Sequence, residues 1–197
     1  METRRFIATT PVNFLYRISA VYLRHGYYRY KFFEIPQGKD VGGVEQKLVD
    51  CYDITTCRMK RARRKRQGLA NVVFVRYERQ FVLMATGGRQ AQFDRLTTYD
   101  FRTTPFHFHD YSVGLLRHIP CVRVRQQLWC EVEKRLIRVA LKHSRQELKR
   151  KIGTLPYANF PGVYWQKIEL AKQIDKRRRR AGLSPLNSKT RKPKATG

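Results

Sequence analysis

Two apolar runs separated by only two residues place the strongest constraint on how this chain folds. Residues 71–77 and 80–86 are rich in Val, Phe, Leu and Met, a composition typical of β-strands packed against a core. Glu78 and Arg79 form the whole connection, so the two strands are expected to pair as an antiparallel hairpin, although this turn lacks the usual glycine. The pattern therefore predicts an antiparallel sheet.

Further strands are predicted on both sides of this hairpin. Aromatic residues crowd the stretch 27–35, which ends at a proline and predicts a third strand. Residues 111–116 and 121–125 predict a second hairpin. The stretch 89–106 predicts a loop, which leaves about four to five strands in the sheet.

Helical signals lie near the start of the chain and throughout its last third. Asp40 is placed to cap an early helix, and residues 128–140 carry apolar residues at helical spacing. Ser144 and Glu147 form a capping-box pattern that predicts another helix start. A final helix is predicted from about residue 163 to the basic run at 177–180.

Together these elements predict an α+β fold with a mostly antiparallel sheet, an early helix and a C-terminal layer of two to three helices. Residues 1–183 are expected to form a single domain. Residues 184–197 are polar and basic, and they predict a flexible tail.

The charge of the chain points to a phosphate polymer as its partner. Lys and Arg number 42 against 15 Asp and Glu, a formal net charge of +27 over 197 residues. Such an excess attracts polyanions and releases their condensed counterions on binding. A charge that serves only solubility is the alternative, but soluble proteins seldom carry a surplus so one-sided. The sequence therefore predicts a nucleic-acid-binding protein, for DNA or RNA.

The positive charge is clustered in an internal run, at a helix end and in the tail. The internal run, 58–66, lies between a predicted helix and a predicted strand, where a rigid scaffold can hold it against phosphates. A solvated charge run or a localisation signal is the alternative interpretation. The candidate nucleic-acid-binding residues are Arg58, Lys60, Arg61, Arg63, Arg64, Lys65, Arg66, Arg76, Arg177, Arg178, Arg179 and Arg180.

Aromatic and basic residues alternate along the predicted strand at 27–35. If one face of that strand is exposed, its rings form a platform on which unpaired bases stack. The alternative is that the rings belong to the core, as aromatic residues on strands more often do. The rings concerned are Tyr27, Tyr28, Tyr30, Phe32 and Phe33.

One pattern carries catalytic content. His107 and His109 flank Phe108, and on a strand two such histidines point to the same side and can share one divalent metal. The pattern resembles the histidine–hydrophobe–histidine motif of the HUH endonucleases, and the stretch from Tyr164 to Lys167 resembles their Tyr-x-x-Lys motif. The resemblance implies a metal-dependent nickase of single-stranded DNA, active in replication or transposition, with Tyr164 as its nucleophile.

No other catalytic motif is present, so binding is favoured over catalysis and no cofactor is expected outside the nickase interpretation. The four cysteines lack the spacing of a zinc site. No apolar run is long enough for a membrane span and no signal peptide is evident, which predicts a protein of the cytoplasm, nucleoid or nucleus that is not secreted. A structural role in a ribonucleoprotein assembly is the third interpretation, and the oligomeric state stays open.

Overall fold

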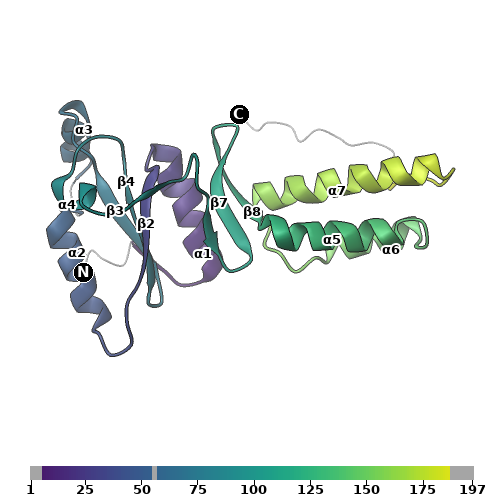
Figure 1. Cartoon of the computed structure of the whole chain (residues 1–197), viewed down its shortest axis with the longest axis horizontal. Helices are drawn as coiled ribbons and strands as arrows, with labels where there is room; N and C mark the ends of the chain where they lie inside the picture. The colour runs from purple at the N-terminus through teal and green to yellow at the C-terminus, as the bar shows by residue number, and fades with distance from the viewer. Residues whose placement is uncertain (1–5, 55–56, 187–197) are drawn as a thin grey trace. The chain divides into compact units, whose positions relative to one another are not determined.

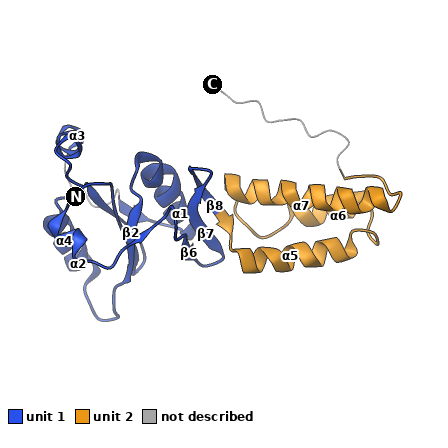
Figure 2. Cartoon of the chain, turned by 45° about the horizontal axis from the view of Figure 1, so that its top comes forward, with its two compact units in different colours: residues 1–122 blue, residues 123–197 orange. Residues whose placement is uncertain are grey.

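The computed structural model describes residues 6–54 and 57–186. The chain divides into two compact units, residues 1–122 and residues 123–197 (Figure 2). The sequence predicts one domain over 1–183, whereas the division falls between Val122 and Arg123, inside the strand Ile119–Val124 and not in a linker. The predicted α+β class is confirmed, with eight strands in two sheets within the described residues. Of the predicted tail, residues 187–197 lie outside the described part.

Unit 1, residues 1–122, is built on a five-stranded sheet in the order β1-β3-β4-β2-β5. The predicted hairpin forms its centre: β3 and β4 are antiparallel, with Tyr77 opposite Gln80. Glu78 adopts a φ of 52° in the turn, the backbone conformation that glycine usually supplies. The strands are β1 (Ile7–Ala8), β2 (Arg29–Glu34), β3 (Val72–Tyr77), β4 (Gln80–Ala85) and β5 (Tyr99–Asp100).

Helices lie on both sides of this sheet (Figure 1). Helix α1 (Pro11–Tyr16) continues into a π-helical turn and is on one side, while α2 (Val41–Tyr52) and α4 (Ala91–Asp94) are on the other. The cap predicted for α2 is confirmed, because the Asp40 carboxylate accepts hydrogen bonds from the backbone N–H groups of the first turn. Both faces of the sheet are thus covered, which explains why its two central strands are almost entirely buried.

The stretch 89–106, for which a loop is predicted, contains α4, β5 and the start of β6 (Phe106–Phe108). Short elements form here because Phe93 and Phe101 are drawn into the core, where both are almost fully buried. The predicted second hairpin is confirmed as β7 (Tyr111–Leu116) and β8 (Ile119–Val124), which join β6 in a three-stranded sheet.

The described part of unit 2, residues 123–186, consists of the end of β8, three helices and their connections. Helices α5 (Gln126–Val139) and α7 (Pro161–Arg180) pack against each other, and the short α6 (Arg145–Gly153) lies between them in the chain. The predicted capping box of α6 is confirmed by reciprocal hydrogen bonds between Ser144 and Glu147, at 2.8 and 3.2 Å. These bonds to Ser144 lower the pKa of the Glu147 carboxyl. No helix of the described residues combines the length and apolar character needed to cross a bilayer.

Candidate nucleic-acid interface

The predicted basic run at 58–66 forms a helix, α3 (Arg58–Arg66), that buries none of its side chains. Seven of its nine residues are Lys or Arg, and six of the seven are exposed. Of the seven cations of α3, only Lys60 and Arg64 form an ion pair with an acidic side chain among the described residues, and both do so with Asp53. Five cations of α3 therefore present their charge to solvent: Arg58, Arg61, Arg63, Lys65 and Arg66.

Arg64 anchors α3 to the rest of unit 1. Its guanidinium donates from Nη2 to the backbone oxygen of Ala70, at 3.0 Å, and from Nη1 to the Asp53 carboxylate, at 3.3 Å. From the sheet side, the Asn71 side chain donates from Nδ2 to the backbone oxygen of Arg61, at 3.1 Å. With 17% of its side chain exposed, Arg64 holds the helix in place instead of projecting outward with the other cations.

A glycine contact fixes the segment that follows α3. Gly88 has a φ of 110°, and a Cβ added to it would lie 2.6 Å from the backbone oxygen of Gly68. Only glycine permits this approach. It allows the backbone of residues 68–70 to exchange hydrogen bonds with Arg89, whose N–H donates to Gly68 at 2.9 Å and whose oxygen accepts from Ala70 at 3.0 Å. The end of α3 is therefore tied to the end of β4.

Arg76, another candidate contact residue, is occupied within unit 1. Its Nε donates to the carboxylate of Glu45 on α2, and Nη1 donates to the backbone oxygen of Glu78. The two paired side chains are 15% and 9% exposed. This sheltered ion pair links β3 to α2, and it leaves the Arg76 guanidinium little exposed surface for a phosphate.

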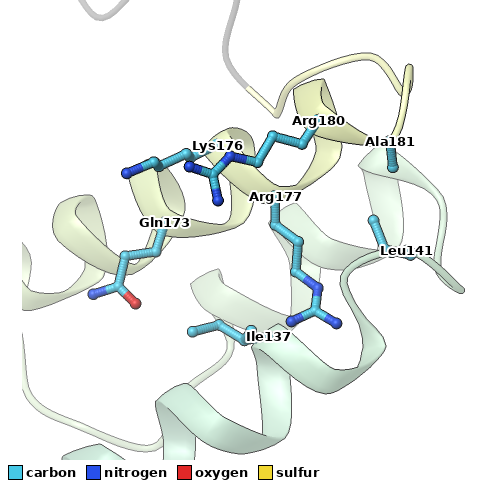
Figure 3. Close-up of a pocket in the computed structure, with 7 residues that line it drawn as sticks. All are labelled: Ile137, Leu141, Gln173, Lys176, Arg177, Arg180 and Ala181. Atoms are coloured by element: carbon cyan, nitrogen blue, oxygen red, sulfur yellow. The ribbon is translucent and has the colours of Figure 1, made fainter.

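A second basic surface lies in unit 2, along a shallow groove between α5 and α7 (Figure 3). Two adjoining hollows of about 470 and 450 Å³ share Ile137 and Arg177. Arg177 extends from α7 across the groove towards α5, beside Ile137 (Figure 3). Five Lys and Arg residues, three aliphatic residues and one acidic residue are among those that line the groove: Lys134, Arg138, Lys176, Arg177, Arg180, Ile137, Leu141, Ala181 and Glu133.

The four arginines at the end of α7 do not share one environment. Arg177, Arg179 and Arg180 are exposed, whereas Arg178 is 5% exposed. The Arg178 guanidinium donates to three backbone oxygens: Ala140 at 2.7 Å, His143 at 2.9 Å and Ser184 at 2.8 Å. These bonds join the ends of α5 and α7, so Arg178 stabilises unit 2 and is not available to a phosphate.

The aromatic strand at 27–35 contributes mainly to the core. Tyr27 and Tyr30 are 7% and 4% exposed, and the Tyr30 ring lies 4.1 Å from the ring of Phe101. Burial raises the pKa of Tyr30 to about 12, and the nearby Tyr99 adds to the shift. Phe33 is half-buried and stacks on Phe81, at 5.0 Å. An open platform of adjacent rings is not formed here.

The histidine pair occupies the end of β6 and the turn that follows it. His107 alternates with the buried Phe106 and Phe108, while His109 lies outside the strand with a φ of 48°. The predicted placement of both histidines on one strand is therefore wrong, because the strand ends at Phe108. Among residues 6–54 and 57–186, no group of three or more His, Cys, Asp or Glu side chains is placed to hold a metal ion. Tyr164, the candidate nucleophile, belongs to unit 2 and lies in the first turns of α7.

The division into units shows where positive charge is densest. Residues 123–197 contain 21 Lys and Arg against 5 Asp and Glu, a net charge of +16, whereas residues 1–122 contain 21 against 10, a net charge of +11. Sequence reasoning missed the cations of α5 that border the groove, Lys134 and Arg138. Their spacing on the polar face of an amphipathic helix was the available signal.

No protein-family model, curated protein or solved structure significantly matches this chain. Its function therefore has to be inferred from the chemistry of its own residues. Two basic surfaces carry that inference: the exposed side of α3, and the groove between α5 and α7.

Proposed function

We propose that this chain binds nucleic acid, DNA or RNA, mainly through contacts of Arg and Lys with phosphates. The observation that carries the proposal is α3, a helix with seven cations and no buried side chain. Five of these cations have no acidic partner among the described residues. Phosphate oxygens are partners that exposed Arg and Lys side chains bind well. The basic groove of unit 2 supports the same partner, because a long polyanion can engage more than one cluster.

The internal energetics of α3 support a functional role for its charge. Like charges at i,i+3 and i,i+4 destabilise a helix by about 0.2–0.5 kcal/mol per pair. Arg61 and Lys65 form such a pair, as do Arg63 and Arg66, and the first turn contains no acidic residue to complement the helix dipole. A helix that serves only to complete the fold would gain stability from neutral or acidic residues at these positions. A bound polyanion removes the repulsion.

The salt dependence of binding tests the proposal. We expect the variant Arg61→Gln/Arg63→Gln/Arg66→Gln to bind DNA or RNA more weakly than the parent protein. The slope of log K against log salt should fall by roughly 0.9 for each lost phosphate contact on duplex DNA, and by roughly 0.7 on a single strand. Arg64 is left unchanged because it anchors the helix.

A matched control removes the same charge from elsewhere in unit 1. Lys39, Lys47 and Arg95 are exposed and lie outside α3, so Lys39→Gln/Lys47→Gln/Arg95→Gln lowers the net charge by the same three units. The proposal requires a larger loss of affinity and slope in the α3 variant than in this control. Equal losses would assign binding to overall charge, and no affinity for duplex DNA, single-stranded DNA or RNA at low salt would overturn the proposal.

A further inference from the structure

Two adjacent aromatic side chains on α7 are exposed to solvent. Tyr164 is 52% exposed and Trp165 is 49% exposed, and their ring centroids are 6.1 Å apart. The other tryptophan of the chain, Trp129, is 3% exposed and donates a hydrogen bond to Glu133. Single exposed apolar side chains are common on protein surfaces, whereas adjacent exposed rings that form a patch are typical of binding sites. Nothing in the fold of unit 2 accounts for this pair.

The pair lies away from the face that α7 packs into unit 2. That face is formed by buried residues such as Val163, Leu170 and Ile174, together with Gln166, which bonds to the backbone of Val124. Among the residues that the structure describes, neither the Tyr164 hydroxyl nor the Trp165 indole N–H has a hydrogen-bond partner. Both the apolar surface of the two rings and their polar atoms are therefore available to a ligand.

Cations continue the exposed face of α7 beyond the aromatic pair. From Trp165, steps of three or four residues lead through Glu169 to Lys172, Lys176 and Arg179, and all of these side chains are exposed. Glu169 is paired with Lys172 at 2.7 Å, a surface ion pair that a competing phosphate can replace. At about 1.5 Å per residue, the face from Trp165 to Arg179 is about 21 Å long.

We propose that this face of α7 binds a single-stranded nucleic acid. Unpaired bases stack on Tyr164 and Trp165, and the backbone follows the helix so that its phosphates meet Lys172, Lys176 and Arg179. The inference rests on the proposed nucleic-acid binding and adds the strand type and the site.

The chemistry of the face favours single strands over other partners. Bases in a duplex present only their edges in the grooves, whereas unpaired bases offer the ring faces that stack on Tyr and Trp. A membrane surface would require the apolar stripe to continue along the helix, yet the exposed positions of α7 after Trp165 are charged or polar. Rings at one end of a basic row can stack one or two bases, while the cations that follow meet the phosphates of the next nucleotides.

Tryptophan fluorescence provides a direct test, because Trp165 is the only exposed one of two tryptophans. The probe is an oligothymidine of about 12 nucleotides, within the usual range of single-strand site sizes. We expect the oligonucleotide to quench the emission of the parent protein, and a blunt-ended duplex of the same length to quench it far less. Trp165→Leu should remove the quenching, whereas the variant Trp129→Phe should retain it.

Affinity provides a second readout. Loss of one stacked base contact corresponds to roughly a fivefold to 150-fold loss of affinity, so Tyr164→Leu and Trp165→Leu should each weaken oligothymidine binding within that range. Tyr164→Phe keeps the ring and should bind like the parent. Because both side chains are half-exposed, the leucine variants are expected to fold, and circular dichroism verifies this.

The failure of this inference can be separated from the failure of the proposed function. If the protein binds oligothymidine without a change in Trp165 emission, and Tyr164→Leu/Trp165→Leu binds equally well, α7 is not the stacking site and nucleic-acid binding stands. A preference for the duplex with quenching by the duplex alone also overturns the inference. If no nucleic acid binds, both proposals are overturned.

Discussion

The guanidinium of Arg178 donates a hydrogen bond to the backbone oxygen of Ala140, at 2.7 Å, and so ties the end of α7 to the end of α5. Ala140 follows the last residue of α5, where backbone oxygens have no partner inside the helix. The same guanidinium satisfies the oxygen of His143, at 2.9 Å. One arginine of a four-residue basic run thus caps a neighbouring helix, while Arg177, Arg179 and Arg180 stay exposed.

The first prediction concerns this buried arginine. Arg178→Met keeps the aliphatic length of the side chain but leaves the oxygens of Ala140, His143 and Ser184 without their donor. We expect the free energy of unfolding of unit 2 to fall by about 2–4 kcal/mol, because the buried Ala140 oxygen left unpaired costs about 1–3 kcal/mol and the part-buried oxygens of His143 and Ser184 cost less. Arg179→Met is the matched control, since Arg179 is exposed and should change stability little. Equal melting temperatures for the two variants would contradict the structural role of Arg178.

Local sequence patterns predict most elements of the fold correctly. They succeed where residues close together in the sequence determine the structure. The hairpin of β3 and β4, the Asp40 cap and the Ser144–Glu147 capping box all follow from residues close together in the sequence. The elements between 89 and 106 do not follow, because α4 is four residues long and β5 two, and each depends on burial of Phe93 or on pairing with β2. The boundary between the two units lies inside a strand, where no linker composition predicts it.

For the candidate site, too, the sequence does not show which side chains face inward and which face solvent. Sequence alone identifies the basic run at 58–66, but it does not show that Arg64 faces inward to Asp53 and Ala70. Nor does it separate Arg178 from its neighbours, since the phase of a helix relative to its core is set by tertiary packing. Exposure, which decides whether an aromatic residue belongs to the core or to a surface, depends likewise on the whole fold. Tyr30 is buried and Trp165 is not.

A second prediction follows from Gln166, a buried polar residue of α7. Its side-chain oxygen accepts from the backbone N–H of Val124, at 2.9 Å, and its side-chain Nε2 donates to the Val124 oxygen, at 3.1 Å. Gln166→Leu leaves both backbone groups of Val124 without this partner in a buried setting. We expect a loss of about 2 kcal/mol or more in unfolding free energy, measured by denaturant titration. Gln173→Leu, at an exposed position of the same helix, should cost little, and a similar loss there would weaken the assignment.

A third prediction concerns stability at alkaline pH. Tyr30 is buried, its hydroxyl donates to the Thr104 oxygen at 3.1 Å, and its pKa is raised from 10.0 to about 12. Between these pH values the unfolded chain loses the proton that the folded chain retains. The contribution of Tyr30 to the free energy of unfolding is therefore complete below pH 10.0, and it is lost as the pH rises towards about 12. Tyr30→Phe should make unfolding less sensitive to pH in this window, as measured by thermal melts. An unchanged pH dependence would contradict the shift.

The last prediction concerns the turn between β7 and β8. Arg117 and His118 connect the strands with φ values of 50° and 66°, a left-handed backbone conformation that glycine adopts without strain. Left-handed backbone costs a residue with a Cβ about 1–2 kcal/mol, so His118→Gly should raise the free energy of unfolding by about 1 kcal/mol once the greater freedom of glycine in the unfolded chain is subtracted. The matched control for this prediction is His25→Gly.

His25 is also exposed but lies in a right-handed 3₁₀ turn, so the same replacement should leave stability unchanged or lower it. Thermal unfolding of both variants measures the difference, and a lower melting temperature for His118→Gly would show that the imidazole makes a contact that outweighs the backbone strain.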